Sequence, residues 1–274
     1  MNKSYPTQLF RFNAEPRTEM MTLQAAIDTL RADQADTLLM DVVPPAEIDA
    51  WWQDDGFASS PFTKNAHHAG TVATAVTMGQ FQREIGPNLV IKAAEYFTVA
   101  ARINDDLRRS RFVRLFTDGL GASALTMESG YPFEFLMATR RIYDPHDQPF
   151  NFAPHCDDIR FGRDAENWPM RKHYADQLSV FLTAQVADNN AGFVMWDYRP
   201  ASRPELDLMH ADYARTGTMG VLDGVASFVV RPQPGQLTLF QCKKLHAIER
   251  CSSQRRTMGL FLLDDGPKGW RFFD

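Results

Sequence analysis

The chain lacks several features that would place it in a special class of protein. It has only 3 cysteines among 274 residues, too few for a disulfide framework, which indicates a reducing compartment. No apolar run is long enough to span a membrane and no signal-peptide core is visible, so we expect a cytoplasmic protein. The net charge of -5 favours neither nucleic acid nor a membrane surface as a partner. The HExxH motif of zinc hydrolases is also absent.

The composition is that of an ordinary globular domain. Hydrophobic residues make up 44% and charged residues 23%, enough to bury a full core without metal ions or disulfides. We therefore predict a single domain over residues 1–274, as a monomer or homodimer. Within it we expect a mainly helical N-terminal support (1–130), a β core (131–265) and a C-terminal tail (266–274).

Helical spacing is clearest in the first half. One apolar stripe with charges between its members predicts a long helix, and it consists of Leu89, Ala93, Tyr96, Ala100, Ile103 and Leu107. Pro45 is placed to begin a second helix that runs through Trp51. We interpret both as core packing against a sheet.

From about Phe133 the pattern changes to short β-branched or aromatic runs. These runs are FEFLMATRRIY, QLSVFLTAQVA, GFVMWDY, ASFVV, GQLTLFQ and RRTMGLFLL. Turn signals such as Asn189-Asn190 and Pro234-Gly235 separate them. Many short strands without intervening helices indicate an antiparallel barrel or jelly roll, in the α+β class with a mainly β core.

A metal-binding pattern lies in this β region. In APHCDDIRF, His155 and Asp157 are two residues apart, so a strand would present both on one face. His246 follows several strands later, after the turn and apolar run PGQLTLF. Two imidazoles and one carboxylate form the facial triad typical of iron(II) sites, which leaves coordination positions open.

An arginine near the end of the chain, if it faces the barrel interior, requires an anionic partner. Arg255 begins the run RRTMGLFLL, and Thr257 would share its face. An arginine aimed into a barrel needs an anion as its partner, and a carboxylate suits the guanidinium group. Arg256 is the alternative, and strand alternation decides between the two.

These features resemble, in their order, the Fe(II)/2-oxoglutarate dioxygenase superfamily, especially its prolyl-4-hydroxylase-like branch. The resemblance covers about residues 133–263 and rests on the stretches RRIYDPHDQPFNFAPHCD, LSVFLTAQVADNNAGFVMWDY and RPQPGQLTLFQCKKLHAIERCSSQRRTMGLFL. It implies a double-stranded β-helix (a cupin-like jelly roll) with His155, Asp157 and His246 as catalytic iron ligands. It further implies that Arg255, Thr257 and Tyr143 bind 2-oxoglutarate, although the segment between Tyr143 and His155 is longer than the family pattern.

The resemblance also implies an activity. The cofactors would be Fe(II), 2-oxoglutarate and O2, and the products succinate, CO2 and a hydroxylated substrate. Halogenating relatives have a small residue in place of the ligand carboxylate, whereas this chain has Asp157, so we expect a hydroxylase.

The substrate is less clearly written. Glu134, Arg140, Trp196 and Tyr198 are candidates for the substrate wall, and Glu134 or Arg140 could bind an amine or carboxylate. Ordinary salt bridges at the rim are the alternative interpretation.

Three functions follow from these observations. We expect an oxygenase that acts on a free amino acid or a similar small polar metabolite. A peptide or prolyl-type protein hydroxylase is the first alternative, and a non-catalytic, cupin-like metal-binding protein is the second.

Overall fold

The computed structural model describes residues 3–60, 62–64, 71–74, 89–126, 134–158 and 176–274. In this part of the chain, a sheet of 11 strands and a sheet of 4 strands make up the β structure. The larger sheet contains β1 (Ser4–Phe10), β2 (Arg17–Thr22), β3 (Thr37–Asp41), β4 (Phe62–Lys64), β5 (Thr71–Thr74), β6 (Ser123–Ala124), β7 (Thr139–Tyr143), β9 (Gln177–Gln185), β12 (Gln236–Phe240), β14 (Arg255–Asp264) and β15 (Trp270–Phe273). The smaller sheet contains β8 (Phe150–His155), β10 (Phe193–Trp196), β11 (Ser227–Val230) and β13 (His246–Glu249).

The strand order is that of a double-stranded β-helix. The larger sheet runs β2-β1-β3-β12-β9-β14-β7-β5-β4, with β15 on β14 and β6 on β15, and the smaller runs β11-β10-β13-β8. All of these pairs are antiparallel except that of β15 with β6. The expected α+β class with a mainly β core is therefore confirmed.

Side-chain alternation divides the larger sheet into two faces. On β9, Phe181 belongs to a cluster that it shares with Phe193 and Ile248 of the smaller sheet, so this face lines the interior between the sheets. Leu182, one residue on, belongs instead to a cluster with residues of the helices. The fold thus has an aromatic interior and a separate aliphatic layer under the helices.

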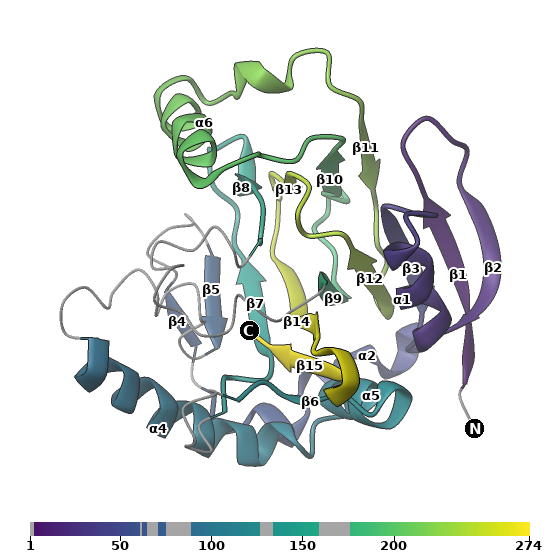
Figure 1. Ribbon diagram of the computed structural model, residues 1–274, viewed down its shortest axis with the longest axis vertical. Coiled ribbons are helices and arrows are strands. Elements are labelled where there is room, and N and C mark those ends of the chain that lie inside the picture. The colour runs from purple at the N-terminus through teal and green to yellow at the C-terminus, as the bar shows by residue number, and fades with distance from the viewer. Residues whose placement is uncertain (1–2, 61, 65–70, 75–88, 127–133, 159–175) are drawn as a thin grey trace.

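The helices cover the outer side of the larger sheet. They are α1 (Leu23–Arg31), α2 (Ile48–Trp52), α4 (Leu89–Leu107) and α5 (Arg111–Leu120), while α6 (Arg203–Thr216) lies beside the smaller sheet (Figure 1). The predicted helix over Leu89–Leu107 is confirmed as α4. Its Asn104 is fully buried and exchanges hydrogen bonds with the backbone of Phe135 (2.8 Å) and Met137 (3.0 Å). Within the described residues, none of the helices combines the length and apolarity that a membrane span requires.

The structure differs from the sequence-based expectation at both ends. Residues 1–130, expected to be mainly helical, also contribute strands β1 to β6, because apolar runs such as Thr37–Asp41 are buried in the sheet. In the expected tail, 266–274, the strand β15 pairs with β14.

An unpredicted helix, α6, interrupts the run of strands. It buries only Leu206 and Met209, so its apolar pattern is weak. Its end signals are visible in the sequence, however: Ser202 caps the first turn and Gly217 ends the helix with a φ of 73°.

The turn before β12 requires glycine. Gly235 has a φ of 90°, and a Cβ there would lie 2.1 Å from the carbonyl oxygen of Val43. We expect Gly235→Ala to lower the free energy of unfolding by roughly 2 kcal/mol more than the ~1–2 kcal/mol cost of a positive φ alone. Gly224→Ala is the matched control, because Gly224 has a φ of 79° and nothing within 4 Å. Equal losses in denaturant unfolding would contradict the close approach at Val43.

Candidate active site

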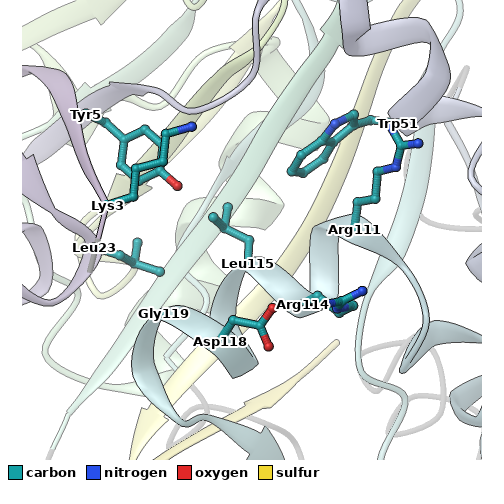
Figure 2. Close-up of a pocket in the computed structure, with 9 residues that line it drawn as sticks. All are labelled: Lys3, Tyr5, Leu23, Trp51, Arg111, Arg114, Leu115, Asp118 and Gly119. Atoms are coloured by element: carbon teal, nitrogen blue, oxygen red, sulfur yellow. Dashed lines mark hydrogen bonds and ion pairs between the residues drawn. The ribbon is translucent and has the colours of Figure 1, made fainter. Parts of the chain in front are cut away.

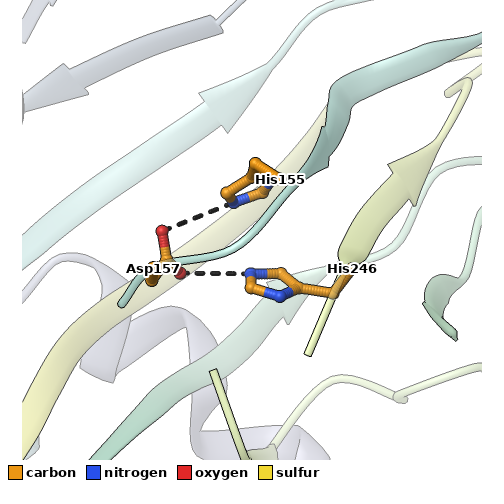
Figure 3. A group of neighbouring side chains, drawn as sticks. All are labelled: His155, Asp157 and His246. Atoms are coloured by element: carbon orange, nitrogen blue, oxygen red, sulfur yellow. Dashed lines mark hydrogen bonds and ion pairs between the residues drawn. The ribbon is translucent and has the colours of Figure 1, made fainter. Parts of the chain in front are cut away.

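Cross-strand pairing brings the three predicted metal ligands together. His246 on β13 lies opposite His155 on β8, and Asp157 follows directly after β8. The Nε2 of His246 lies 3.1 Å from Oδ2 of Asp157, and the Nε2 of His155 lies 3.6 Å from Oδ1 (Figure 3). One candidate ligand atom from each residue lies within 4.8 Å of the others. This grouping is compact enough for one ion.

Backbone carbonyls orient both imidazoles. The Nδ1 of His155 donates to the carbonyl of Ala153 (2.7 Å), and the Nδ1 of His246 donates to that of Lys244 (2.8 Å). Since Nδ1 carries the proton in each ring, Nε2 presents its lone pair toward Asp157. The tautomers are therefore those of a metal-binding pair.

Further hydrogen bonds hold the ligand segments. The backbone N–H of Asp157 donates to Cys242 (2.9 Å), and the side chain of Gln177 donates to the carbonyl of Asp157 (2.5 Å). Lys244 is buried, and its Nζ lies 2.7 Å from both Asp36 and Asp197. Asp36 also accepts a hydrogen bond from the backbone of Phe12 (3.0 Å), so these contacts connect the His246 segment to the N-terminal strands.

The electrostatics favour a cation among these side chains. Burial, together with the adjacent imidazole of His246, lowers the pKa of His155 to about 3, so this imidazole is neutral at pH 7. Burial alone would raise the pKa of Asp157, but the two neighbouring imidazoles and the charge of Arg141 hold it below its usual value. A carboxylate with two aligned imidazole nitrogens is the donor set of the 2-His-1-carboxylate triad, which suits Fe(II).

Arg255 supplies a buried cation in the same interior. Its side chain is only 1% exposed, and its Nη1 donates to the carbonyl of Ala191 (2.8 Å). Its Nε and Nη2, and the hydroxyl of Thr257 on the same face, are buried without a hydrogen-bond partner among the described residues. A buried guanidinium with unused donors is costly unless an anion binds there. The far carboxylate of 2-oxoglutarate therefore fits this position.

The neighbours of Arg255 agree with this geometry. Tyr143 is buried on β7 directly opposite Arg255 on β14. Arg256 points to the other face, where its guanidinium lies over the ring of Trp52 at 5.7 Å and its Nε donates to Gln254. Alternation thus places Arg255 and Thr257, and not Arg256, in the interior.

The substrate-wall candidates lie elsewhere. Arg140 is on the outer face of the larger sheet, where it donates to the backbone of Trp52 (2.9 Å) and Phe57 (3.2 Å). Glu134 forms an ion pair with Arg108, which directly follows α4. These placements correct the prediction for both residues and match the salt-bridge alternative for Glu134.

Trp196 and Tyr198 also face away from the interior. Both pack in a cluster with residues of α6, and the Tyr198 hydroxyl donates to Glu205 of that helix. The strand that ends at Trp196, β10, presents Met195 to the interior instead, since Met195 is the residue paired with His246. The prediction for these two residues is corrected accordingly.

Sequence reasoning overlooked Arg141 and Asp274. Arg141 alternates with Arg140 on β7 and shares the inner face with Tyr143 and Thr139. Its Nη2 donates to both carboxylate oxygens of Asp274, at 2.8 and 2.7 Å. Once Tyr143 is assigned to the interior, the same alternation predicts Arg141 there, so a signal was available for Arg141 but none for Asp274.

A separate cavity of about 330 Å³ lies at the outer surface, beside the N-terminal strands and α5 (Figure 2). Its lining residues are Lys3, Tyr5, Leu23, Trp51, Arg111, Arg114, Leu115, Asp118 and Gly119. None of them belongs to the interior site, and the chemistry resides with the buried ligands and not with this surface cavity.

The fold and this site together define a class of enzyme: the chain belongs to the Fe(II)/2-oxoglutarate-dependent dioxygenase superfamily. It is 55% identical, over 100% of both chains and with a TM-score of 0.87, to an N-substituted L-amino acid dioxygenase from Burkholderia ambifaria AMMD. The structure of such a dioxygenase from the same organism in complex with α-ketoglutarate (2-oxoglutarate) matches with 54% identity, the same full coverage and a TM-score of 0.86.

Other comparisons give no match: no family model matches the chain, and neither does any curated protein. The full-length identity of 55% and the three grouped ligands show that the protein is an enzyme that uses Fe(II) and 2-oxoglutarate. The alternative of a non-catalytic cupin-like protein is therefore set aside.

The contrast between Arg255 and Arg140 predicts that their replacement changes the free energy of unfolding by different amounts. Arg255→Leu removes a buried charge with unused donors, so we expect the metal-free protein to change by less than about 1 kcal/mol. Arg140→Leu removes two hydrogen bonds and contacts with the rings of Trp52 and Phe57, and should cost about 2–3 kcal/mol. Urea unfolding of both variants measures the difference. A larger loss for Arg255→Leu would contradict the cost that we assign to the unpartnered Nε and Nη2 of Arg255.

Proposed function

We propose that this enzyme hydroxylates a C–H bond of an N-substituted L-amino acid. The observation that carries this proposal is the 55% identity, over the full length of both chains, to a dioxygenase with that substrate class. The interior between the two sheets, which contains the three ligands and the aromatic residues Phe181 and Phe193, is the place where such a molecule would meet the iron.

In this proposal His155, Asp157 and His246 hold the iron. The ring orientations support these roles, since Ala153 and Lys244 accept the Nδ1 protons and leave both Nε2 atoms available. When bound, iron and 2-oxoglutarate supply the oxidising chemistry that transfers oxygen from O2 to the substrate, with release of succinate and CO2. With iron bound, the carboxylate of Asp157 would take the coordination position that a halide would need, which favours hydroxylation over halogenation.

Arg255, Thr257 and Tyr143 would hold 2-oxoglutarate. The unpartnered Nε and Nη2 of Arg255 offer two donors to its far carboxylate, and the Thr257 hydroxyl offers a third. Because the guanidinium is fixed by Ala191 and stacks near the ring of Phe181 at 5.6 Å, it is ordered before the co-substrate arrives. The co-substrate would therefore bind in one orientation, with its keto-acid end toward the iron ligands.

Anaerobic titration tests the iron and co-substrate roles. Iron(II) followed by 2-oxoglutarate should produce a weak visible charge-transfer band that requires both additions. Arg255→Leu should raise the 2-oxoglutarate concentration at half-saturation by roughly 30- to 1,000-fold, the equivalent of about 2–4 kcal/mol. Arg256→Leu, the neighbouring arginine on the outer face, should leave it unchanged.

Two results would reject these roles. The first is a band that persists in Asp157→Ala, and the second is a larger effect from Arg256→Leu than from Arg255→Leu.

The substrate class needs its own test. N-alkyl and N-acyl derivatives of L-amino acids, with and without a carboxylate on the acyl group, should be incubated with the iron-loaded enzyme. Product mass spectrometry is expected to show a gain of one oxygen atom for at least one N-substituted compound. Oxidation of the unsubstituted amino acids alone would overturn the proposed substrate class, even if the charge-transfer band forms.

A further inference from the structure

A second arginine reaches the interior from β7. Arg141 lies opposite Thr257 of β14, one inward-facing position along from the pair formed by Tyr143 and Arg255. Its side chain is 20% exposed, whereas the carboxylate that pairs with it, Asp274, is 1% exposed. Of this ion pair, the carboxylate of Asp274 is therefore shielded from solvent, while part of the Arg141 side chain is accessible.

The contacts of Asp274 hold the arginine at one of its nitrogens. Asp274 accepts hydrogen bonds from Nη2 of Arg141 and from the hydroxyl of Thr139 (2.7 Å), and its backbone N–H donates to Leu136 (2.7 Å). Among the described residues, Nη1 and Nε of Arg141 form no hydrogen bond, and the side chain keeps part of its surface exposed. These two nitrogens are therefore the ones that a ligand could bind.

Gly259 provides the room for this guanidinium. A Cβ at Gly259 would lie 3.2 Å from Nη1 of Arg141 and 3.3 Å from the carbonyl of Val180, closer than side chains usually pack. Arg141 therefore lies over the backbone of β14 at a position where a larger residue would displace it.

The two interior arginines point to opposite ends of the sheet. Arg255 donates to Ala191, which lies beyond the end of β9, whereas Arg141 extends over Gly259 toward Asp274. Asp157 lies at this second end, because its carbonyl accepts a hydrogen bond from Gln177 at the start of β9. Arg141 is thus the arginine on the iron side of the interior.

A substrate carboxylate suits this position. Substitution on the nitrogen of an amino acid removes or crowds the ammonium group but leaves the α-carboxylate, so the compound is recognised chiefly as an anion. Arg255, which lies farther from the iron ligands, would bind the far carboxylate of 2-oxoglutarate. We propose that Arg141 binds the α-carboxylate of the substrate through its Nη1 and Nε side, and that Asp274 is a positioning residue that fixes the guanidinium. This inference rests on the proposed function.

The test compares a carboxylate substrate with its amide. The probe is whichever N-substituted L-amino acid the wild type oxidises fastest in the screen above, together with the carboxamide of the same compound. For the wild type, kcat/KM should favour the carboxylate by about 10- to 100-fold, the range for one charge-assisted hydrogen bond. In Arg141→Gln this preference should fall to near unity through a higher KM for the carboxylate, while the carboxamide is oxidised as before.

Control variants separate binding from folding. Arg140→Gln removes the same charge from the outer face and should keep the preference of the wild type. Asp274→Asn should raise KM for the carboxylate with little change in kcat, because it loosens the guanidinium without removing it. If Arg141→Gln does not fold, Arg141→Lys keeps the charge and should retain part of the preference.

The outcomes are distinct. An unchanged preference in Arg141→Gln would overturn the assignment. A raised requirement for 2-oxoglutarate in the charge-transfer titration, with the preference intact, would overturn it in favour of a co-substrate role. If the wild type forms the band but oxidises no N-substituted amino acid, the proposed function fails first and this inference falls with it.

Discussion

The antiparallel register of β13 against β8 is the constraint on which the rest of the site depends. It sets His246 opposite His155, and a slip of one residue would turn one imidazole out of the interior. The ring orientations then follow from carbonyls within the same two segments, those of Ala153 and Lys244. A metal site specified by strand register and backbone hydrogen bonds needs few dedicated side chains beyond the ligands themselves.

The interior separates charge along its length. Arg255 lies toward the end of the larger sheet at Ala191, while Asp157, Arg141 and Asp274 lie toward the other end. Between them the lining is aromatic, with Phe181, Phe193 and Phe240 close to one another. A low-polarity middle strengthens the electrostatic pull of each end on a charged ligand. In the proposed roles, 2-oxoglutarate would bind at the end with Arg255 and the substrate carboxylate at the end with Arg141.

Much of the fold and of the grouping of ligands could be predicted from the sequence. The strand-rich second half, the helix Leu89–Leu107 and the approach of His155, Asp157 and His246 all follow from periodicity and motif order. The choice between Arg255 and Arg256 needed only alternation within β14. These features depend on local patterns, which the sequence carries directly.

Features that depend on residues distant in the sequence were harder to predict from the sequence. Alternation with Tyr143 separates Arg141 from Arg140, but their roles depend on distant partners, which are Trp52 and Phe57 for Arg140 and Asp274 for Arg141. Helix α6 buries too few apolar residues to produce a clear periodic pattern. Strand β15 depends on pairing with β14, which no short motif reveals.

Lys244 links the N-terminal strands to the segment that carries His246. Its carbonyl sets the tautomer of His246, and its ammonium group joins Asp36, beside the N-terminal strands, to Asp197 after β10. The strands β1 to β3 therefore contribute to the support of the metal site, and replacing them with those of another enzyme of this fold would disturb it. A chimaera that replaced them would lose Asp36, one of the two carboxylates that hold Lys244, and would loosen the segment whose carbonyl orients His246.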